Sequence, residues 1–345
     1  MFRVTAYRTR VAVIAALTLL CLPACSAGQP KSSDAAARVK GPISLVYLQK
    51  QGDQQYFLDE ADGARARAAE LGVQLKVVDV GTDADRTVRE VRSAVGAGAH
   101  GVIVVVPDPV VGPEVARITR DAGVVLLASD DQICTNLADP AVCAHKRLVP
   151  RVGFSSAQTG FEVGRRAAEE YRKAGWKPAD TRVVSVWRHD VSVCRERVDA
   201  AAEAFLQAGQ VTTLDLGTDN TVAGAQQKVA ATVAAERSGV RHWVVWGCND
   251  ENVQGAVTAL QEAGVGPDHV IGVGLGAYLA CRNWVSGRPT GMRAALFING
   301  RAVGALAVQT VYDRLRDGRE MPAESFAPAT MVDAATWKTS GAACH

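Results

Sequence analysis

Short runs of β-branched and aliphatic residues alternate along the chain with longer stretches whose apolar residues recur at helical spacing. The first runs predict strands at 43–48, 73–80, 101–106 and 124–128. Helices are predicted between them at 56–71 and 87–95, with Gly72 and Gly96 at positions where helices commonly end. Because strands that alternate with helices form parallel sheets, this part of the chain is predicted to be α/β.

The same alternation starts again after residues 132–148, with strands predicted at 149–154, 182–187, 211–214, 240–246 and 270–273. Two successive arrays of similar size predict two Rossmann-like, doubly wound lobes with a hinged cleft between them. The N-terminal lobe is assigned 41–153 plus 299–320, and the C-terminal lobe 154–298 plus 321–345. Hinges are predicted near 153–155, 296–300 and 317–322, where elements end in small residues or proline.

The N-terminus has the order of an export signal. Three arginines precede an apolar run at 11–22, and Leu-Pro-Ala-Cys ends at Cys25. This order predicts a lipoprotein signal peptide over 1–25 and a lipid-modified Cys25, followed by a flexible tether at 26–40. We therefore expect an exported protein that is anchored to the outer face of the cell membrane.

Charge is balanced along the chain. The sequence holds 38 Lys and Arg against 36 Asp and Glu, with a formal net charge of +2, and the two signs are mixed throughout. This pattern argues against nucleic acid, or any strongly charged molecule, as a partner.

Six cysteines follow Cys25, an even number in a compartment that permits oxidation, so disulfides are favoured over a metal site. Cys134 and Cys143 flank a short loop and are predicted to form one bridge. The remaining four allow three pairings, among which the sequence does not choose: Cys194, Cys248, Cys281 and Cys344.

Polar residues stand where several predicted strands end, which is where ligands bind in parallel sheets. These residues are Lys50 and Gln51, Asp108 between two prolines, Asp130 and Asp131, Arg195, and Asn249 with Asp250. For Asp108 and Asp250, a helix N-cap or a solvated turn is an equal alternative. Cys194 and Cys248 each directly precede one of these residues, so a bridge between them is a hypothesis that would stiffen the second lobe's half of the cleft.

Two adjacent carboxylates, Asp130 and Asp131, repel each other unless hydrogen-bond donors or a cation meet them. The vicinal hydroxyls of a sugar donate to carboxylates and accept from Arg, Lys and Asn. The C–H faces of a sugar ring pack against aromatic side chains, here Tyr56, Phe57, Phe154 and Trp187. The residue types therefore predict a site for a sugar or another polyol.

Several segments resemble the type I periplasmic sugar-binding proteins of bacterial ABC transporters, and among them the arabinose-binding group. The similarity runs from about 43 to 335 and is carried by 44–57, 107–109, 128–132, 160–176, 240–243, 246–250 and 270–274. It implies two lobes, joined by three crossovers, that close on a monosaccharide and present it to an ABC permease. It also implies a monomer without enzymatic activity, cofactor or metal.

By position, the resemblance implies sugar hydrogen bonds from Lys50, Asp130, Asp131, Arg195 and Asn249, and an apolar wall of Tyr56, Phe57 and Phe154. The chain departs from the arabinose pattern at Gln54, where the group has glutamate, and at Gly276, where it has asparagine. Each change removes or alters one polar contact. An arabinose-like pentose or a related hexose is therefore expected, and the identity of the sugar is open.

The sequence gives less support to other function classes. His189 and Cys194 lack a third group to orient them, and no GxSxG motif occurs, so catalysis is not expected. A sugar-responsive repressor would carry a helix-turn-helix headpiece where this chain has its export signal. A sensor of the same fold, which hands its sugar-bound form to a membrane kinase, remains the alternative to a transport receptor.

Overall fold

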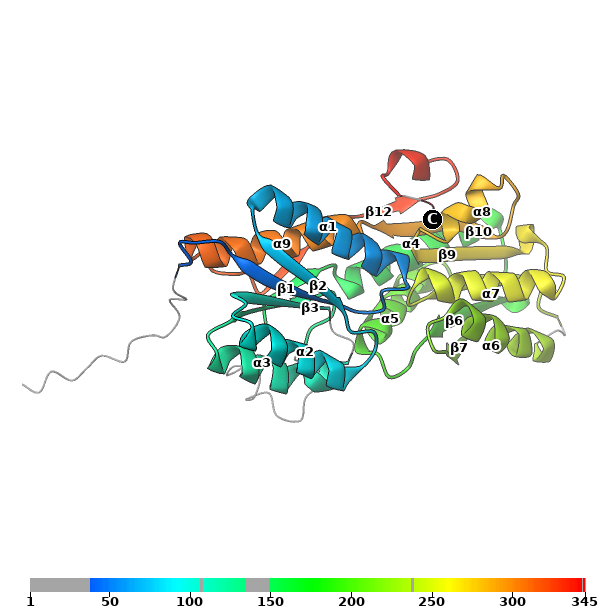
Figure 1. Cartoon of the computed structure of the whole chain (residues 1–345). Helices are drawn as coiled ribbons and strands as arrows, with labels where there is room; N and C mark the ends of the chain where they lie inside the picture. The colour runs from blue at the N-terminus through cyan, green and yellow to red at the C-terminus, as the bar shows by residue number, and fades with distance from the viewer. Residues whose placement is uncertain (1–37, 106–107, 134–148, 237–238, 343, 345) are drawn as a thin grey trace, which may run out of the picture. The chain divides into compact units, whose positions relative to one another are not determined.

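Two α/β sheets with helices on both faces make up the computed structural model, which describes residues 38–105, 108–133, 149–236, 239–342 and 344 (Figure 1). The described residues belong to one unit, Ala36–His345. The predicted signal at 1–25 with Cys25, most of the tether, and the predicted Cys134–Cys143 bridge lie outside the described residues.

The first sheet has the strand order β11-β5-β4-β3-β1-β2. Its strands are β1 (Ser44–Gln49), β2 (Gln74–Asp79), β3 (Gly101–Val105), β4 (Val125–Ser129), β5 (Arg151–Gly153) and β11 (Glu324–Phe326). Neighbouring strands are all parallel. Their carboxyl ends therefore lie along one edge, where the loops after β1 and β4 meet.

Helices cover both faces of this sheet (Figure 1). One face carries α1 (Gln55–Leu71) and α9 (Gly300–Asp317), and the other carries α2 (Ala84–Gly96) and α3 (Gly112–Asp121). In β1, Leu45 and Tyr47 pack with α1 and α9, whereas Val46 and Leu48 pack with α2 and α3. Burial on both faces explains why central strands such as β1 and β3 are nearly continuous apolar runs.

The second sheet has the order β12-β10-β9-β8-β6-β7. Its strands are β6 (Thr181–Trp187), β7 (Thr212–Gly217), β8 (His242–Gly247), β9 (Val270–Gly276), β10 (Met292–Ile298) and β12 (Ala329–Val332). All neighbours are parallel except β12, which is antiparallel to β10. One face is covered by α4 (Ser156–Ala174) and α5 (Ser192–Leu206), the other by α6 (Val222–Ala235), α7 (Asp250–Glu262) and α8 (Ala280–Val285). Single 3-10 turns occur at Pro109–Val111, Pro178–Asp180, Pro267–His269 and Trp337–Thr339.

The predicted class, two doubly wound α/β lobes, is confirmed. β5 pairs with β4 and β11 in the first sheet, which is where the assignment of 41–153 to the N-terminal lobe puts it, and the second array begins after this strand. The assignment of all of 321–345 to the C-terminal lobe is wrong for β11, which is bonded to β5. The third crossover accordingly lies between β11 and β12, and not at 317–322. The remaining lobe boundaries stay predictions.

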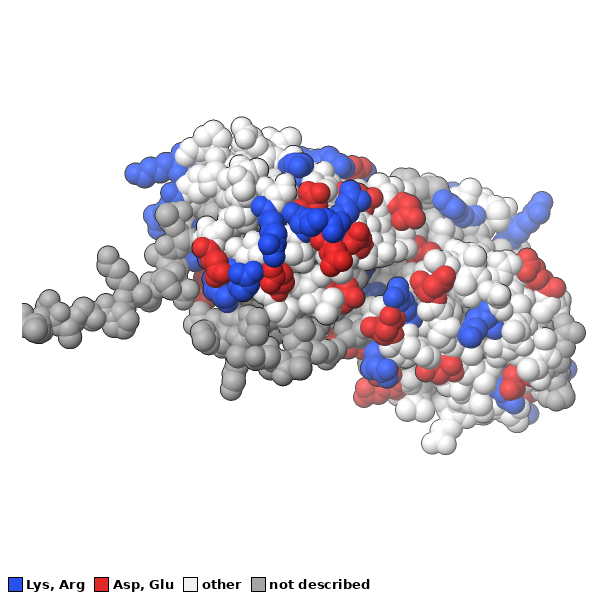
Figure 2. Space-filling view, turned by 60° about the horizontal axis from the view of Figure 1, so that its bottom comes forward, with Lys and Arg blue, Asp and Glu red and all other residues white. Residues whose placement is uncertain are grey.

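On the face shown in Figure 2, basic and acidic side chains are interspersed, and neither sign forms one large area. Basic and acidic side chains of the described residues also pair directly, as Arg92 and Arg117 do with Glu114 at 2.6 and 3.0 Å. The balance of charge seen in the sequence is thus a local balance on this surface.

Candidate functional site

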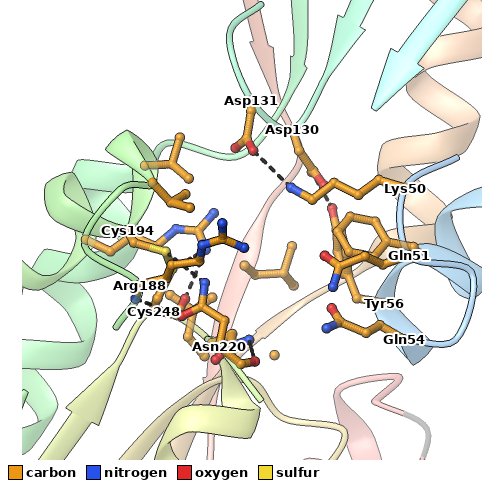
Figure 3. A pocket seen from close by; sticks show the side chains of 18 of the residues that line it. Lys50, Gln51, Gln54, Tyr56, Asp130, Asp131, Arg188, Cys194, Asn220 and Cys248 are labelled. Atoms are coloured by element: carbon orange, nitrogen blue, oxygen red, sulfur yellow. Dashed lines mark hydrogen bonds and ion pairs between the residues drawn. A yellow bond between two sulfur atoms is a disulfide. The ribbon is translucent and has the colours of Figure 1, made fainter. Parts of the chain in front are cut away.

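A cavity of about 280 Å³ is lined by residues that follow strands of both sheets. Nine of the ten predicted ligand-site residues line it: Lys50, Gln54, Tyr56, Phe57, Asp130, Asp131, Phe154, Asn249 and Gly276 (Figure 3). Strand-end loops converge here because the sheets are parallel. The tenth predicted residue, Arg195, is not among the lining residues.

The first sheet supplies a cation, a carboxylate and an aromatic ring. Lys50, directly after β1, places its Nζ 3.3 Å from Asp131 Oδ2, and both side chains are mostly buried. The same ammonium lies 5.5 Å from the centre of the Phe57 ring. Figure 3 shows Lys50 and Asp131 pointing toward each other across this part of the cavity. The pair offers a donor and an acceptor to one polar ligand.

Asp130 is the buried carboxylate of the site. It accepts a hydrogen bond of 2.7 Å from the Tyr56 hydroxyl. Burial, and next the charge of Asp131, raise the pKa of Asp130 to about 6, although the Tyr56 hydrogen bond acts in the other direction. Asp130 is thus ionised at neutral pH with little solvent around it, and is suited to accept hydrogen bonds from a ligand.

A second buried acid near Asp130 is Glu60 of α1, which was not singled out by the sequence. Ser129 donates to its carboxyl group, and the residue has no exposed surface. Burial, followed by repulsion from Asp130, raises the pKa of Glu60 well above its ordinary value. Burial and the charge of Asp130 thus both disfavour the ionised form of Glu60.

A neighbouring arginine, and not the predicted Arg195, lines the cavity. Arg195 is exposed, with its guanidinium 5.0 Å from the Trp187 ring, whereas Arg197 is buried and lines the cavity. Residues two apart on a helix point about 200° apart, so α5 can turn only one of these side chains toward the site. The buried positions Cys194, Val198 and Ala201 recur at helical spacing, and Arg197 falls beside that stripe while Arg195 does not.

Arg197 is held in place on two sides. Its Nη1 donates to the carbonyl oxygen of Cys248 at 2.9 Å, and its guanidinium lies 4.7 Å from the Phe154 ring. Burial lowers the pKa of Arg197, and the carboxylates of Asp131 and Asp130 oppose that shift. An arginine retains its charge at neutral pH under such conditions.

Asn249 caps α7 and also lines the cavity. Its Oδ1 accepts from the Asn252 amide at 3.1 Å, and its Nδ2 donates to the Asn220 carbonyl at 3.0 Å. Asn220, which the sequence reading missed, lines the cavity in a left-handed conformation with φ +64°. It accepts from the Arg188 amide at 3.0 Å. Asn–Asn contacts thus order the loops of the second sheet.

The mouth of the cavity carries charges that sequence reasoning also missed. Arg188 pairs with Asp190 through two contacts of 2.7 and 2.9 Å, and Asp219 lies among the same lining residues. Asp108 lines the cavity, although its Oδ1 also accepts from the Val110 amide in a turn. Arg188, Asp190 and Asp219 follow strands β6 and β7, so a search of every strand end would have found them, as it found Asp108 after β3.

The turn after β9 is shaped by Gly276, which has φ +132°. A Cβ atom at this position would lie 2.5 Å from Cε1 of Tyr278, so the tyrosine ring occupies the space next to the glycine. The Tyr278 hydroxyl donates to Glu251 at 2.6 Å. Burial raises the pKa of Glu251 to about 7, against the effect of that hydrogen bond.

Asp250 has a structural role, but it is neither the helix N-cap, which is Asn249, nor a residue of a solvated turn. It is fully buried, does not line the cavity, and accepts from the amides of Leu279 and Ala280 at 2.7 and 3.0 Å. It therefore fixes the turn that carries Tyr278.

Two disulfides occur among the described residues, Cys194–Cys248 and Cys281–Cys344. The hypothesis of a Cys194–Cys248 bridge beside the ligand residues is confirmed, and both cysteines line the cavity. This bridge ties the start of α5, which carries Arg197, to the loop after β8, which carries Asn249.

Within the described part of the chain, no group of three or more His, Cys, Asp or Glu side chains is arranged to hold a metal ion. In the same part, the helices lack the length and apolar character that a membrane span requires.

Comparison with known proteins places this geometry in context. A family model described as a periplasmic binding protein domain matches residues 45–320. An L-arabinose-binding periplasmic protein of an ABC transporter from Azospirillum brasilense is 27% identical over 325 residues, which are 93% of this chain and 95% of that protein. The L-arabinose-binding periplasmic protein of Escherichia coli K12 is 24% identical over 287 residues, 81% of this chain and 84% of that protein.

Solved structures agree on the fold. A periplasmic solute-binding protein from Actinobacillus succinogenes with bound D-allose has a TM-score of 0.75 at 18% identity, and the match covers 86% of this chain and 99% of that one. The Caulobacter myo-inositol binding protein has a TM-score of 0.72 at 20% identity, covering 88% and 97%. The names of all these proteins describe solute binding, in agreement with the prediction that this chain is not an enzyme. With 45–320 matched and both lobes formed, the chain belongs to the periplasmic binding protein family.

Proposed function

We propose that the cavity binds a monosaccharide. The observation that carries this proposal is the combination of Asp130 and Asp131 with Lys50 and Arg197 in one cavity that aromatic rings also line. Carboxylates accept from sugar hydroxyls and the two cations donate to them, while the rings of Tyr56, Phe57 and Phe154 suit the C–H face of a sugar. The names of the two arabinose-binding relatives support the same class of ligand.

An arabinose-like pentose or a related hexose is the expected ligand. Gln54 and Gly276 are the positions that depart from the arabinose pattern, and both line the cavity. The loss of two polar contacts at about 1 to 3 kcal/mol each, about 2 to 6 kcal/mol together, would weaken binding of arabinose itself by roughly 30-fold to roughly 20,000-fold. The Tyr278 ring, which fills the space beside Gly276, offers an aromatic face in place of an amide at that point.

Even so, a micromolar affinity is within reach. A monosaccharide has ten to twelve non-hydrogen atoms, and about 0.8 kcal/mol for each gives about −8 kcal/mol or better, which corresponds to a Kd of about 1 μM or tighter.

The protein is further proposed to be a monomeric lipoprotein, anchored through Cys25 outside the cell membrane, that delivers its sugar to an ABC permease. The predicted signal peptide supports the anchor, and the relatives from ABC transporters support the permease as partner. A receptor that signals through a membrane kinase would use the same site. The two roles differ in the membrane protein that binds the sugar-loaded form, and a pull-down against each partner separates them.

The direct test is calorimetric titration of the chain from Ser26 onward against pentoses, hexoses and polyols. Arg197→Ala should weaken the response to the best ligand by about 10- to 100-fold, the effect of one charge-assisted hydrogen bond. Arg195→Ala is the matched control, since it removes the same side chain from the exposed side of α5. No response to any sugar, or equal losses in the two variants, would refute the proposed site.

A further inference from the structure

Arg151 of β5 is a buried arginine whose role the ligand site does not explain. It does not line the cavity, yet its side chain is only 10% exposed. Its Nη1 donates to the backbone carbonyl of Asp130 at 2.8 Å, and its Nη2 contacts Glu324 Oε1 at 2.6 Å. The guanidinium also lies 5.1 Å from the centre of the Phe326 ring. One side chain thus joins the strand on each side of its own.

The first of these partners is the residue with the most unusual backbone at the site. Asp130 has φ +62°, a left-handed conformation that residues other than glycine rarely adopt. Its amide donates to the Val152 carbonyl at 2.8 Å, and Arg151 binds its carbonyl. A Cβ atom at position 153 would lie 3.0 Å from Cα of Asp130, so Gly153 permits β5 to approach this closely. Residues of β5 thus bind both the amide and the carbonyl of Asp130.

The second partner belongs to a crossover between the sheets. Glu324 is in β11, which leads into β12 of the second sheet, and β5 leads into α4 of the second sheet. The two strands are bonded at both ends, by the Arg151 amide to Ala323 at 3.0 Å and by the Ala327 amide to Gly153 at 2.7 Å. Two of the three crossovers therefore run side by side, and Arg151 spans them.

We propose that Arg151 is a positioning residue that holds Asp130 in its left-handed conformation and couples it to the paired crossover strands β5 and β11. The effect of Arg151 on ligand binding rests on the proposed function, in which Asp130 accepts hydrogen bonds from the sugar. The planar guanidinium has donors on two sides, so it can hold the Asp130 carbonyl and Glu324 at once. A lysine ammonium at the same position is a single point charge and would not span both.

If Arg151 couples these two sites, a substitution of Glu324 should speed backbone hydrogen exchange around Asp130. The test is backbone hydrogen exchange of the full chain, read at 129–132 and 323–327, in Arg151→Met and Glu324→Gln. Arg166→Met is the control: Arg166 bridges Glu170 at 2.9 Å and Asp333 at 3.1 Å, is similarly buried, and does not line the cavity. Arg151→Met should speed exchange at both segments by about tenfold or more, and Glu324→Gln should speed exchange at 129–132 in the same direction by less.

The outcomes separate this proposal from a purely structural salt bridge. Exchange at 129–132 that stays at the wild-type rate in Glu324→Gln overturns the coupling, as does a rise spread evenly over both sheets in either variant. If Arg151→Met does not fold, Glu324→Gln decides alone. Titration with L-arabinose adds a second readout: in a protein that binds it, Arg151→Met should lose about tenfold in affinity and Arg166→Met should not. A wild-type protein that does not bind L-arabinose refutes L-arabinose as the ligand, and the exchange result alone then decides the coupling.

Discussion

Comparison of the two disulfides of the second sheet separates two effects of the Cys194–Cys248 bridge, its effect on ligand binding and its effect on stability. Cys194–Cys248 has a sequence separation of 54 and Cys281–Cys344 one of 63. The chain-entropy relation gives about 4 kcal/mol for each at 25 °C, and the two values differ by only about 0.1 kcal/mol. Removal of either bridge by paired alanine substitutions should therefore lower the free energy of unfolding by a similar amount.

Ligand affinity should respond differently. Cys194 and Cys248 line the cavity, Arg197 donates to the Cys248 carbonyl, and Asn220 Nδ2 lies 3.4 Å from Cys194 Sγ. Cys281 and Cys344 are not lining residues. Loss of the first bridge frees the loop that positions Arg197, so Cys194→Ala with Cys248→Ala should weaken sugar binding by about tenfold or more, which is about 1.4 kcal/mol.

Denaturant unfolding of both double variants gives the free energy of unfolding, and calorimetric titration at the same temperature gives the ligand affinity. The titration is made well below the unfolding transition, so that both variants are folded when ligand is added. An affinity loss of the same size in Cys281→Ala with Cys344→Ala would show that binding merely follows global stability. Unchanged affinity in the Cys194 and Cys248 variant would refute the reasoning outright.

Two further predictions concern strain and protonation. Gly276→Ala should destabilise the fold by about 2 to 5 kcal/mol, because the added Cβ meets Tyr278 and φ is +132°. The control is Gly209→Ala, at φ +149° with only an ordinary contact, which should cost about 1 to 3 kcal/mol. Equal losses of unfolding free energy in the two variants, measured by chemical unfolding, would contradict the clash with Tyr278. The raised pKa of Asp130 means that the folded state binds more protons than the unfolded state between about pH 4 and pH 6, so this group makes unfolding harder as pH falls through that window. Asp130→Asn should remove this trend, and sugar affinity in the wild type should fall below about pH 6 as the carboxylate is lost; an affinity that does not change between pH 7 and pH 5 would refute the acceptor role.

Much of the fold was determined by local sequence pattern. Apolar runs buried on both faces, such as β3 at Gly101–Val105, are readable because helices cover both sides of each sheet. The strand-end rule placed Lys50, Asp130, Asp131 and Asn249 in one cavity for the same reason, since parallel strands bring their carboxyl ends to one edge. These predictions needed no knowledge of which strand pairs with which.

Pairing between distant segments was decided by the tertiary structure alone. The short strand β11 carries no pattern that assigns it to a sheet, and only its hydrogen bonds to β5 place it in the first one. Whether Arg197 or Arg195 reaches the cavity depends on the rotation of α5 against its sheet. The helical spacing of the buried residues of α5 indicates this rotation, whereas the distance of each arginine from the strand end does not. The cysteine pairing is of the same kind: three pairings satisfy the sequence, and the packing of α5 against the loop after β8 brings Cys194 to Cys248.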